Sequence, residues 1–125
     1  MKRALLQNVK VAPYESGAVI DRQGFLSAIA AAEIATAGVL TLTVTHSDTS
    51  GGTYTAVKDT HILVDENSTI VTDGKIDLTA TVGEVENVDL DLLGCKPFVK
   101  ITASGTAATD AVLAYALGDP QIAPV

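Results

Sequence analysis

Residues 39–57 constrain the fold more than any other stretch, because a strict two-residue alternation there runs into an abrupt polar break. Apolar side chains alternate with threonines along its first half, at Leu40, Leu42 and Val44 against Thr41, Thr43 and Thr45. That pattern predicts a strand with one apolar face and one hydroxyl-bearing, β-branched face. The run Ser-Asp-Thr-Ser-Gly-Gly then favours a chain reversal before a second strand at residues 54–57. The stretch therefore predicts a β-hairpin at the centre of the fold.

Later segments keep this alternation at the spacing expected of a β-sandwich. We expect strands at residues 61–64, 69–72, 76–81, 87–92, 98–104 and 111–117, with a hairpin turn at Asp73 and Gly74. Residues 111–117 are apolar on both faces, which favours a central strand or an interface strand. The predicted fold is all-β, a single antiparallel β-sandwich that is jelly-roll-like. The side chains expected in or lining its core are Leu40, Leu42, Val44, Leu90, Leu92, Val99, Ile101, Leu113 and Leu117.

Residues 25–36 allow two interpretations. Their alanines and Glu33 have high helix propensity, which favours a helix. A strand would instead place alternate apolar residues on one face, namely Leu26, Ala28, Ala30, Ala32 and Ile34. We favour the strand, because intrinsic propensity is a weak guide that packing often overrides.

The 125 residues suit one domain, and their charge is unevenly placed. The net charge is -7, yet the first ten residues hold three bases and no acid. We expect an N-terminal arm at residues 1–15, extended or forming a short edge strand, then the sandwich at 16–120 and a tail at 121–125. Apolar side chains between the bases would gain nothing on a free tail, so the arm is predicted to contact a neighbouring subunit. The predicted contact residues are Lys2, Arg3, Leu5, Leu6, Val9, Lys10 and Val11.

Composition argues against several classes of partner. Affinity for nucleic acid comes mainly from neutralising phosphates, so a net charge of -7 disfavours it. Aromatic residues make up only 4%, with no Trp, which disfavours platforms that stack sugars or bases. No apolar run is long enough for a signal peptide or a membrane span, so we expect no membrane partner and synthesis in the cytoplasm. The hydrophobic content of 47% is mostly small residues, which favours a flat surface that needs a protein partner.

No constellation for catalysis or cofactor binding is visible. His46 and His61 match no zinc-site spacing, and Ser47 beside His46 fits a turn rather than a nucleophile. The acidic run at residues 84–91 lacks a calcium-loop pattern and fits a solvated strand face, although calcium binding stays open. Cys95 is the single cysteine, expected as a small buried residue. We therefore expect neither enzymatic activity nor a cofactor or bound transition metal.

Four sequence blocks together resemble short structural proteins encoded in the head and tail gene clusters of tailed bacteriophages. The blocks are DRQGF at 21–25, THSDTSGGTYTAV at 45–57, VDLDLLGCKPFVKI at 88–101 and AVLAYALGDP at 111–120. Each block is weak alone, but together they span most of the chain. Many relatives in that group carry a Trp where Tyr54 stands here.

This resemblance implies a virion component located on the capsid surface and synthesised in the host cytoplasm. The implied role is a capsid decoration or cement protein that binds the major capsid protein, stabilises the head shell and forms a homo-oligomer. The alternative is a tail-associated or host-adhesion module that binds carbohydrate.

Overall fold

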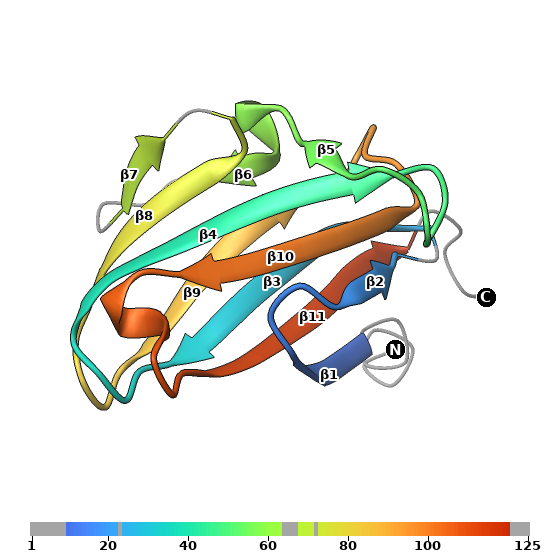
Figure 1. Ribbon diagram of the computed structural model, residues 1–125. Coiled ribbons are helices and arrows are strands. Elements are labelled where there is room, and N and C mark those ends of the chain that lie inside the picture. Colours follow the sequence, from blue (N-terminus) through green and yellow to red (C-terminus); the bar gives the residue numbers. More distant parts are fainter. Residues whose placement is uncertain (1–9, 23, 64–67, 72, 121–125) are drawn as a thin grey trace.

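The computed structural model describes residues 10–22, 24–63, 68–71 and 73–120, and these form two antiparallel sheets packed face to face (Figure 1). Sheet A contains, in spatial order, β1 (Lys10–Tyr14), β11 (Val112–Pro120), β3 (Phe25–Glu33), β9 (Val85–Asp91) and β6 (Ile62–Leu63). Sheet B contains β2 (Val19–Asp21), β10 (Phe98–Ser104), β4 (Gly38–Ser47), β8 (Lys75–Ala80) and β7 (Ser68–Val71), with β5 (Thr55–Ala56) added to β4. The predicted all-β sandwich is confirmed.

The described residues contain no α-helix, only the short 3-10 helices η1 (Asp59–His61) and η2 (Thr106–Ala108). Among them, accordingly, no helix is long and apolar enough to cross a membrane.

Strand pairing in the sandwich is nested. β1 pairs with β11, β2 with β10, β3 with β9 and β4 with β8. Successive strands from β1 to β4 alternate between sheets A and B, and so do those from β8 to β11. A long hairpin rolled up in this way is the jelly roll, with β5, β6 and β7 inserted in the connection between β4 and β8.

The segment that allowed either a helix or a strand forms strand β3, as favoured from the sequence. It pairs with β11 on one side and β9 on the other, so its backbone groups are bonded along both edges. Its inward side chains are the small residues Ala28, Ala30 and Ala32, which are 8%, 6% and 2% exposed. Alternate burial of alanines in a two-sided ladder outweighs their helix propensity here.

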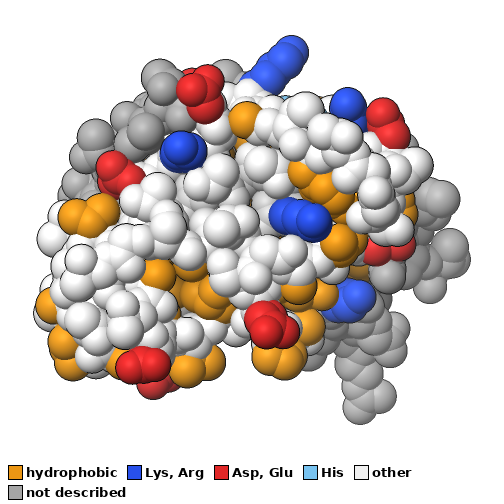
Figure 2. Space-filling view, viewed as in Figure 1, with side chains coloured by type: hydrophobic (Ala, Val, Ile, Leu, Met, Phe, Trp, Pro, Cys, Tyr) orange, Lys and Arg blue, Asp and Glu red, His pale blue; other side chains and the backbone are white. Residues whose placement is uncertain are grey.

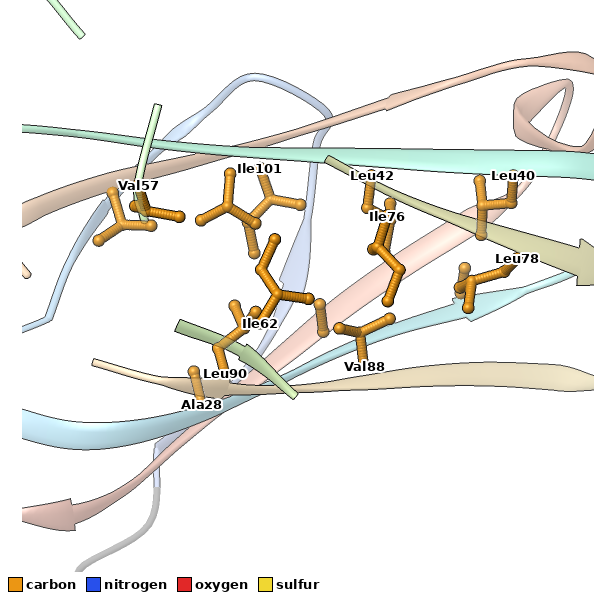
Figure 3. Packing of buried hydrophobic residues seen from close by; sticks show 14 of the residues in the cluster. Ala28, Leu40, Leu42, Val57, Ile62, Ile76, Leu78, Val88, Leu90 and Ile101 are labelled. Carbon is orange, nitrogen blue, oxygen red and sulfur yellow. The ribbon is translucent and has the colours of Figure 1, made fainter. Parts of the chain in front are cut away.

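The core lies between the two sheets and is filled from both (Figure 3). Leu40, Leu42, Ile76 and Leu78 of sheet B lie above Val88 and Leu90 of sheet A in that view. Of the nine residues predicted to be in or to line the core, eight are buried, and Leu113 is partly buried against it. The buried eight are Leu40, Leu42, Val44, Leu90, Leu92, Val99, Ile101 and Leu117.

The predicted central hairpin exists, but its second strand is short. Only Thr55 and Ala56 pair back with β4, and the main partners of β4 are β10 and β8. At Val44 the hydrogen-bond partner of β4 changes from β8 to β5. The Val44 amide donates to the Gly74 carbonyl, and the Val44 carbonyl accepts from the Val57 amide. Gly74 has φ of 73°, and a Cβ there would lie 2.8 Å from the Val44 oxygen, so this crossing requires glycine.

Tyr14 ties the first strand to the opposite sheet. Its hydroxyl donates to the Ala18 carbonyl at 2.5 Å and accepts from the Ile101 amide of β10 at 2.9 Å. Its ring meets Tyr115 edge to face, with centroids 5.7 Å apart. Burial raises the pKa of the Tyr14 hydroxyl, so the proton needed for donation is retained. These contacts, which we call the Tyr14 corner, hold the end of β1 against β10 at a position beyond the short strand β2.

Replacing a core side chain should destabilise the sandwich strongly. Leu40→Ala removes a side chain that is 0% exposed, and we expect it to lower the free energy of unfolding by about 2–5 kcal/mol in urea titrations. Val39→Ala, at a neighbouring position that is 49% exposed, is the control and should cost less than about 1 kcal/mol. Equal losses in the two variants would contradict this core.

The Tyr14 corner gives a second stability prediction. Tyr14→Phe leaves the Ile101 amide without its hydroxyl partner, and we expect a loss of about 1–3 kcal/mol in the free energy of unfolding. Tyr54→Phe is the matched control, because that hydroxyl donates only to the exposed Ser50 carbonyl, at 2.8 Å. A cost for Tyr14→Phe no larger than for the control would show that the corner contributes nothing to stability.

Candidate interaction surface

The outer faces of the two sheets differ in chemistry. Outward positions on β4, β8 and β10 carry mainly hydroxyl and charged side chains, namely Thr41, Thr43, Thr45, Lys75, Asp77, Thr79, Lys100, Thr102 and Ser104. The Thr41 hydroxyl donates to the Asp77 carboxylate at 2.6 Å. Seen from this side, the middle of the face consists mainly of polar side chains and backbone, drawn white in Figure 2. Sheet B therefore presents a surface suited to water.

Sheet A presents small and aliphatic side chains instead. Cross-strand neighbours place Val11 beside Ala116 and Ile29 in one row, and Pro13 beside Ala114 and Ala31 in the next. Together with the outward valines at the far end, these residues form what we call the apolar face: Val11, Pro13, Ile29, Ala31, Val85, Val112, Ala114 and Ala116. Val11, Val112, Val85 and Ile29 are 70%, 64%, 55% and 44% exposed. An exposed apolar surface of this kind marks a site for protein contact.

Acidic side chains border the apolar face and interrupt one row of it. β3, β9 and β11 contain no Lys or Arg, and the outward positions of β3 and β9 include Asp89, Asp91 and Glu33, which lies between Val112 and Val85 in the register. Asp89 lies beside Ile29 in the register and Asp91 beside Ser27. Between β3 and β9 the surface is hollowed into an open groove of about 460 Å³, lined by Ser27, Ala28, Ile29, Asp89, Leu90 and Asp91. This arrangement offers aliphatic contact and negative potential to one partner.

The structure places two of the seven predicted contact residues. Lys10 and Val11 begin β1 and pair with Leu117 and Ala116. Val11 belongs to the apolar face, while Lys10 shares the inward side with Leu117 and is half-buried. The other five, Lys2, Arg3, Leu5, Leu6 and Val9, lie outside the described residues, so their contact role stays a prediction.

Two of the sequence blocks meet at one end of the sandwich through Arg22. Its guanidinium donates to the carbonyls of Cys95 at 2.8 Å, Phe25 at 3.1 Å and Lys96 at 3.3 Å. Its backbone amide donates to the Pro97 carbonyl. Arg22 therefore holds the β9–β10 loop against the β2–β3 loop, and the DRQGF and LGCKPFVK segments form one structural unit.

Both histidine rings form hydrogen bonds with backbone groups at this same end of the sandwich. The Lys96 amide donates to His46 Nδ1 at 3.2 Å, and His61 Nδ1 donates to the Asp91 carbonyl at 2.7 Å. Burial lowers the pKa of His46, and the nearby Lys96 ammonium lowers it further, so its ring is neutral at pH 7. Across the described residues, no three or more His, Cys, Asp or Glu side chains are grouped to hold a metal ion. The geometry gives both rings a structural role.

Tyr54, in the loop of the central hairpin, does not offer an open ring. The Lys100 ammonium lies 4.1 Å from the ring centroid, and the hydroxyl bonds within the loop. A sugar that stacked on this ring face would have to displace a cation–π contact. The loop therefore gives little support to carbohydrate binding.

Comparisons of the chain with protein-family profiles, with curated proteins and with solved structures each found no match. The resemblance to phage structural proteins consequently depends on the four sequence blocks alone.

Sequence reasoning did not identify the groove. The prediction that Asp89 and Asp91 lie on the outward face of a strand is correct, but the pattern does not indicate that Ile29 and Ser27 lie beside them. The sequence did indicate an interface, because residues 111–117 are apolar on both faces of the predicted strand. It did not indicate which strands lie beside that strand.

Cys95 should react slowly with thiol reagents. The side chain is 4% exposed, and burial raises the pKa of its thiol from 9.0 to about 11. Below pH 9 a shift of this size lowers the thiolate fraction roughly 100-fold relative to the unfolded chain. Labelling with a chromogenic disulfide at pH 8 should be correspondingly slow. The Arg22 charge lowers the pKa of the Cys95 thiol, so its loss disfavours the thiolate, but we expect Arg22→Met to speed labelling because the loosened loop exposes the buried thiol. Lys100→Met is the control, and labelling of the Arg22 variant no faster than the control would contradict the role of Arg22.

Proposed function

We propose that this chain is a virion structural protein of a tailed bacteriophage, a decoration or cement protein that binds and stabilises the head shell. The observation that carries the proposal is the exposed apolar face of sheet A. The partner is the major capsid protein, the protein acts as a homo-oligomer on the capsid surface, and neither catalysis nor a cofactor is involved.

The physical argument rests on the difference between the two outer faces. Covering an aliphatic side chain contributes about 1.5–3 kcal/mol, whereas an exposed ion pair contributes about 0–1 kcal/mol. The apolar face holds four well-exposed aliphatic side chains among alanines, so a flat subunit surface could cover them together. A flat contact of this kind suits a shell, where the same contact repeats at symmetry-related positions.

The predicted contact residues are consistent with this proposal. Val11 is on the apolar face, and residues 1–9 lead into β1, the first strand of that sheet. We propose that Lys2, Arg3, Leu5, Leu6, Val9 and Lys10 add contacts to the capsid or to a neighbouring subunit.

The alternative of a tail-associated or host-adhesion carbohydrate-binding module has less support. Its best sequence feature was the hairpin around Tyr54, and Lys100 occupies one face of that ring. No observation of the described surface favours sugar over protein as the partner.

A charge-insertion experiment on purified capsids that lack this protein tests the proposal. The double variant Val11→Glu, Val112→Glu places two carboxylates on exposed positions of the apolar face. If two covered valines are lost at about 1.5 kcal/mol each, affinity for the shell falls about 100-fold in co-sedimentation assays.

The matched control is Val19→Glu, Val39→Glu, which makes the same change at exposed valines of sheet B. Circular dichroism and thermal melting should show both double variants folded. Equal shell binding by the two folded variants would rule out the apolar face as the docking surface.

A further inference from the structure

The β9–β10 loop, residues 92–97, connects sheet A to sheet B at one end of the sandwich. It contains two buried side chains, Leu92 and Cys95, which are 2% and 4% exposed. On one side Arg22 donates to the Cys95 and Lys96 carbonyls. On the other side the two histidine rings bond to its backbone, so the loop is held from three separate segments of the chain.

The two rings differ in what a proton does to their contacts. His46 Nδ1 accepts the Lys96 amide at 3.2 Å, and this contact requires a nitrogen that carries no proton. His61 Nδ1 donates to the Asp91 carbonyl at 2.7 Å, and a protonated ring keeps that hydrogen. Acid therefore removes the contact at His46 and leaves the one at His61.

Charged and titratable groups of the described residues face His46 from three segments. They are the Lys96 ammonium on the loop, the His61 ring on η1 and the Asp48 carboxylate just after β4. The positions paired with His46 on β10 and β5 are a valine and a threonine, which carry no charge. The balance at this ring is thus between two basic groups and one acid.

These surroundings disfavour a charged ring. Burial lowers the pKa of His46 below its ordinary value of 6.5, and Lys96 and His61 lower it further. Asp48 acts in the opposite direction, but its carboxylate lies 3.6 Å from the Lys96 ammonium, which offsets its charge. When the loop moves away, the ring regains a more ordinary pKa. Protons therefore favour the open loop as the pH falls below 6.5, whereas above it the closed loop keeps its full stability.

We propose that the β9–β10 loop is an acid-released latch: protonation of His46 removes the acceptor of the Lys96 amide and raises the population in which the loop has moved off β4 and exposes Cys95. The contacts from Arg22 and His61 use donors that acid does not remove, so the change is confined to how often the loop opens. The latch goes beyond the proposed function and does not depend on it, since neither histidine belongs to the apolar face.

Labelling of Cys95 in the full chain measures the opening. The rate with a dipyridyl disulfide, which reacts down to acidic pH, is divided at each pH by the rate for the urea-unfolded chain, so that the thiolate fraction cancels. We expect this ratio to rise about fivefold from pH 7.5 to pH 5, the factor expected for loss of one hydrogen bond. His46→Gln keeps an acceptor for the Lys96 amide and cannot titrate, so its ratio should stay flat. His61→Gln is the matched control and should retain the rise.

Imidazole ¹⁵N spectra of the unmodified chain give a second readout that needs no variant. We expect His46 Nδ1 to carry no proton at pH 7.5 and to take one up below pH 6.5, while exchange of the Lys96 amide becomes faster. An equal rise in the His46→Gln variant, or a rise abolished only by His61→Gln, would overturn the latch. A flat labelling ratio while His46 takes up its proton, or a His46 ring that stays neutral at pH 5, would overturn it as well.

Discussion

One-sided burial is the constraint on which this structure depends. Each strand of a two-layer sandwich alternates its side chains, so only half of them reach the core. In sheet B the other half are mainly hydroxyl and charged side chains that water solvates. In sheet A the other half of β1, β3 and β11 are mainly alanine, valine, isoleucine and proline. The outer face of sheet B is therefore polar and solvated, whereas the outer face of sheet A exposes apolar side chains.

The alanines of β3 show how the two layers depend on each other. Ala28, Ala30 and Ala32 are small side chains in a core to which sheet B contributes large ones such as Leu40 and Leu42. On the outward side, the same alanine-rich segment leaves a flat surface at Ala31. Composition suited to close packing inside thus also produces the flat apolar face outside.

Much of the fold was predictable because alternation is a local property. The pattern at residues 87–92 gave β9 with Val88, Leu90 and Leu92 buried, and the Asp73–Gly74 signal gave a turn in which both residues have positive φ. Pairing over long distances was not predictable from local pattern. Nothing near β4 in the sequence indicates that β10 and β8 are its main partners, or that Tyr14 bonds to Ile101. The candidate site was missed for the same reason, since it exists only once β1, β11, β3 and β9 lie side by side.

The sheet edges help to decide how this protein can associate. Edge strands commonly join by continuing the hydrogen-bond ladder, but here the edges at β1, β6 and β2 are poor templates, and the remaining edge strand, β7, has only four residues. β1 has five residues with Pro13, which lacks an amide hydrogen, and β6 has two residues. β2 has three, and beyond it the Tyr14 and Ser16 hydroxyls accept the Ile101 and Ala103 amides of β10. With pairing at the edges restricted in this way, the broad face of sheet A is the surface through which a second molecule can gain the most contact.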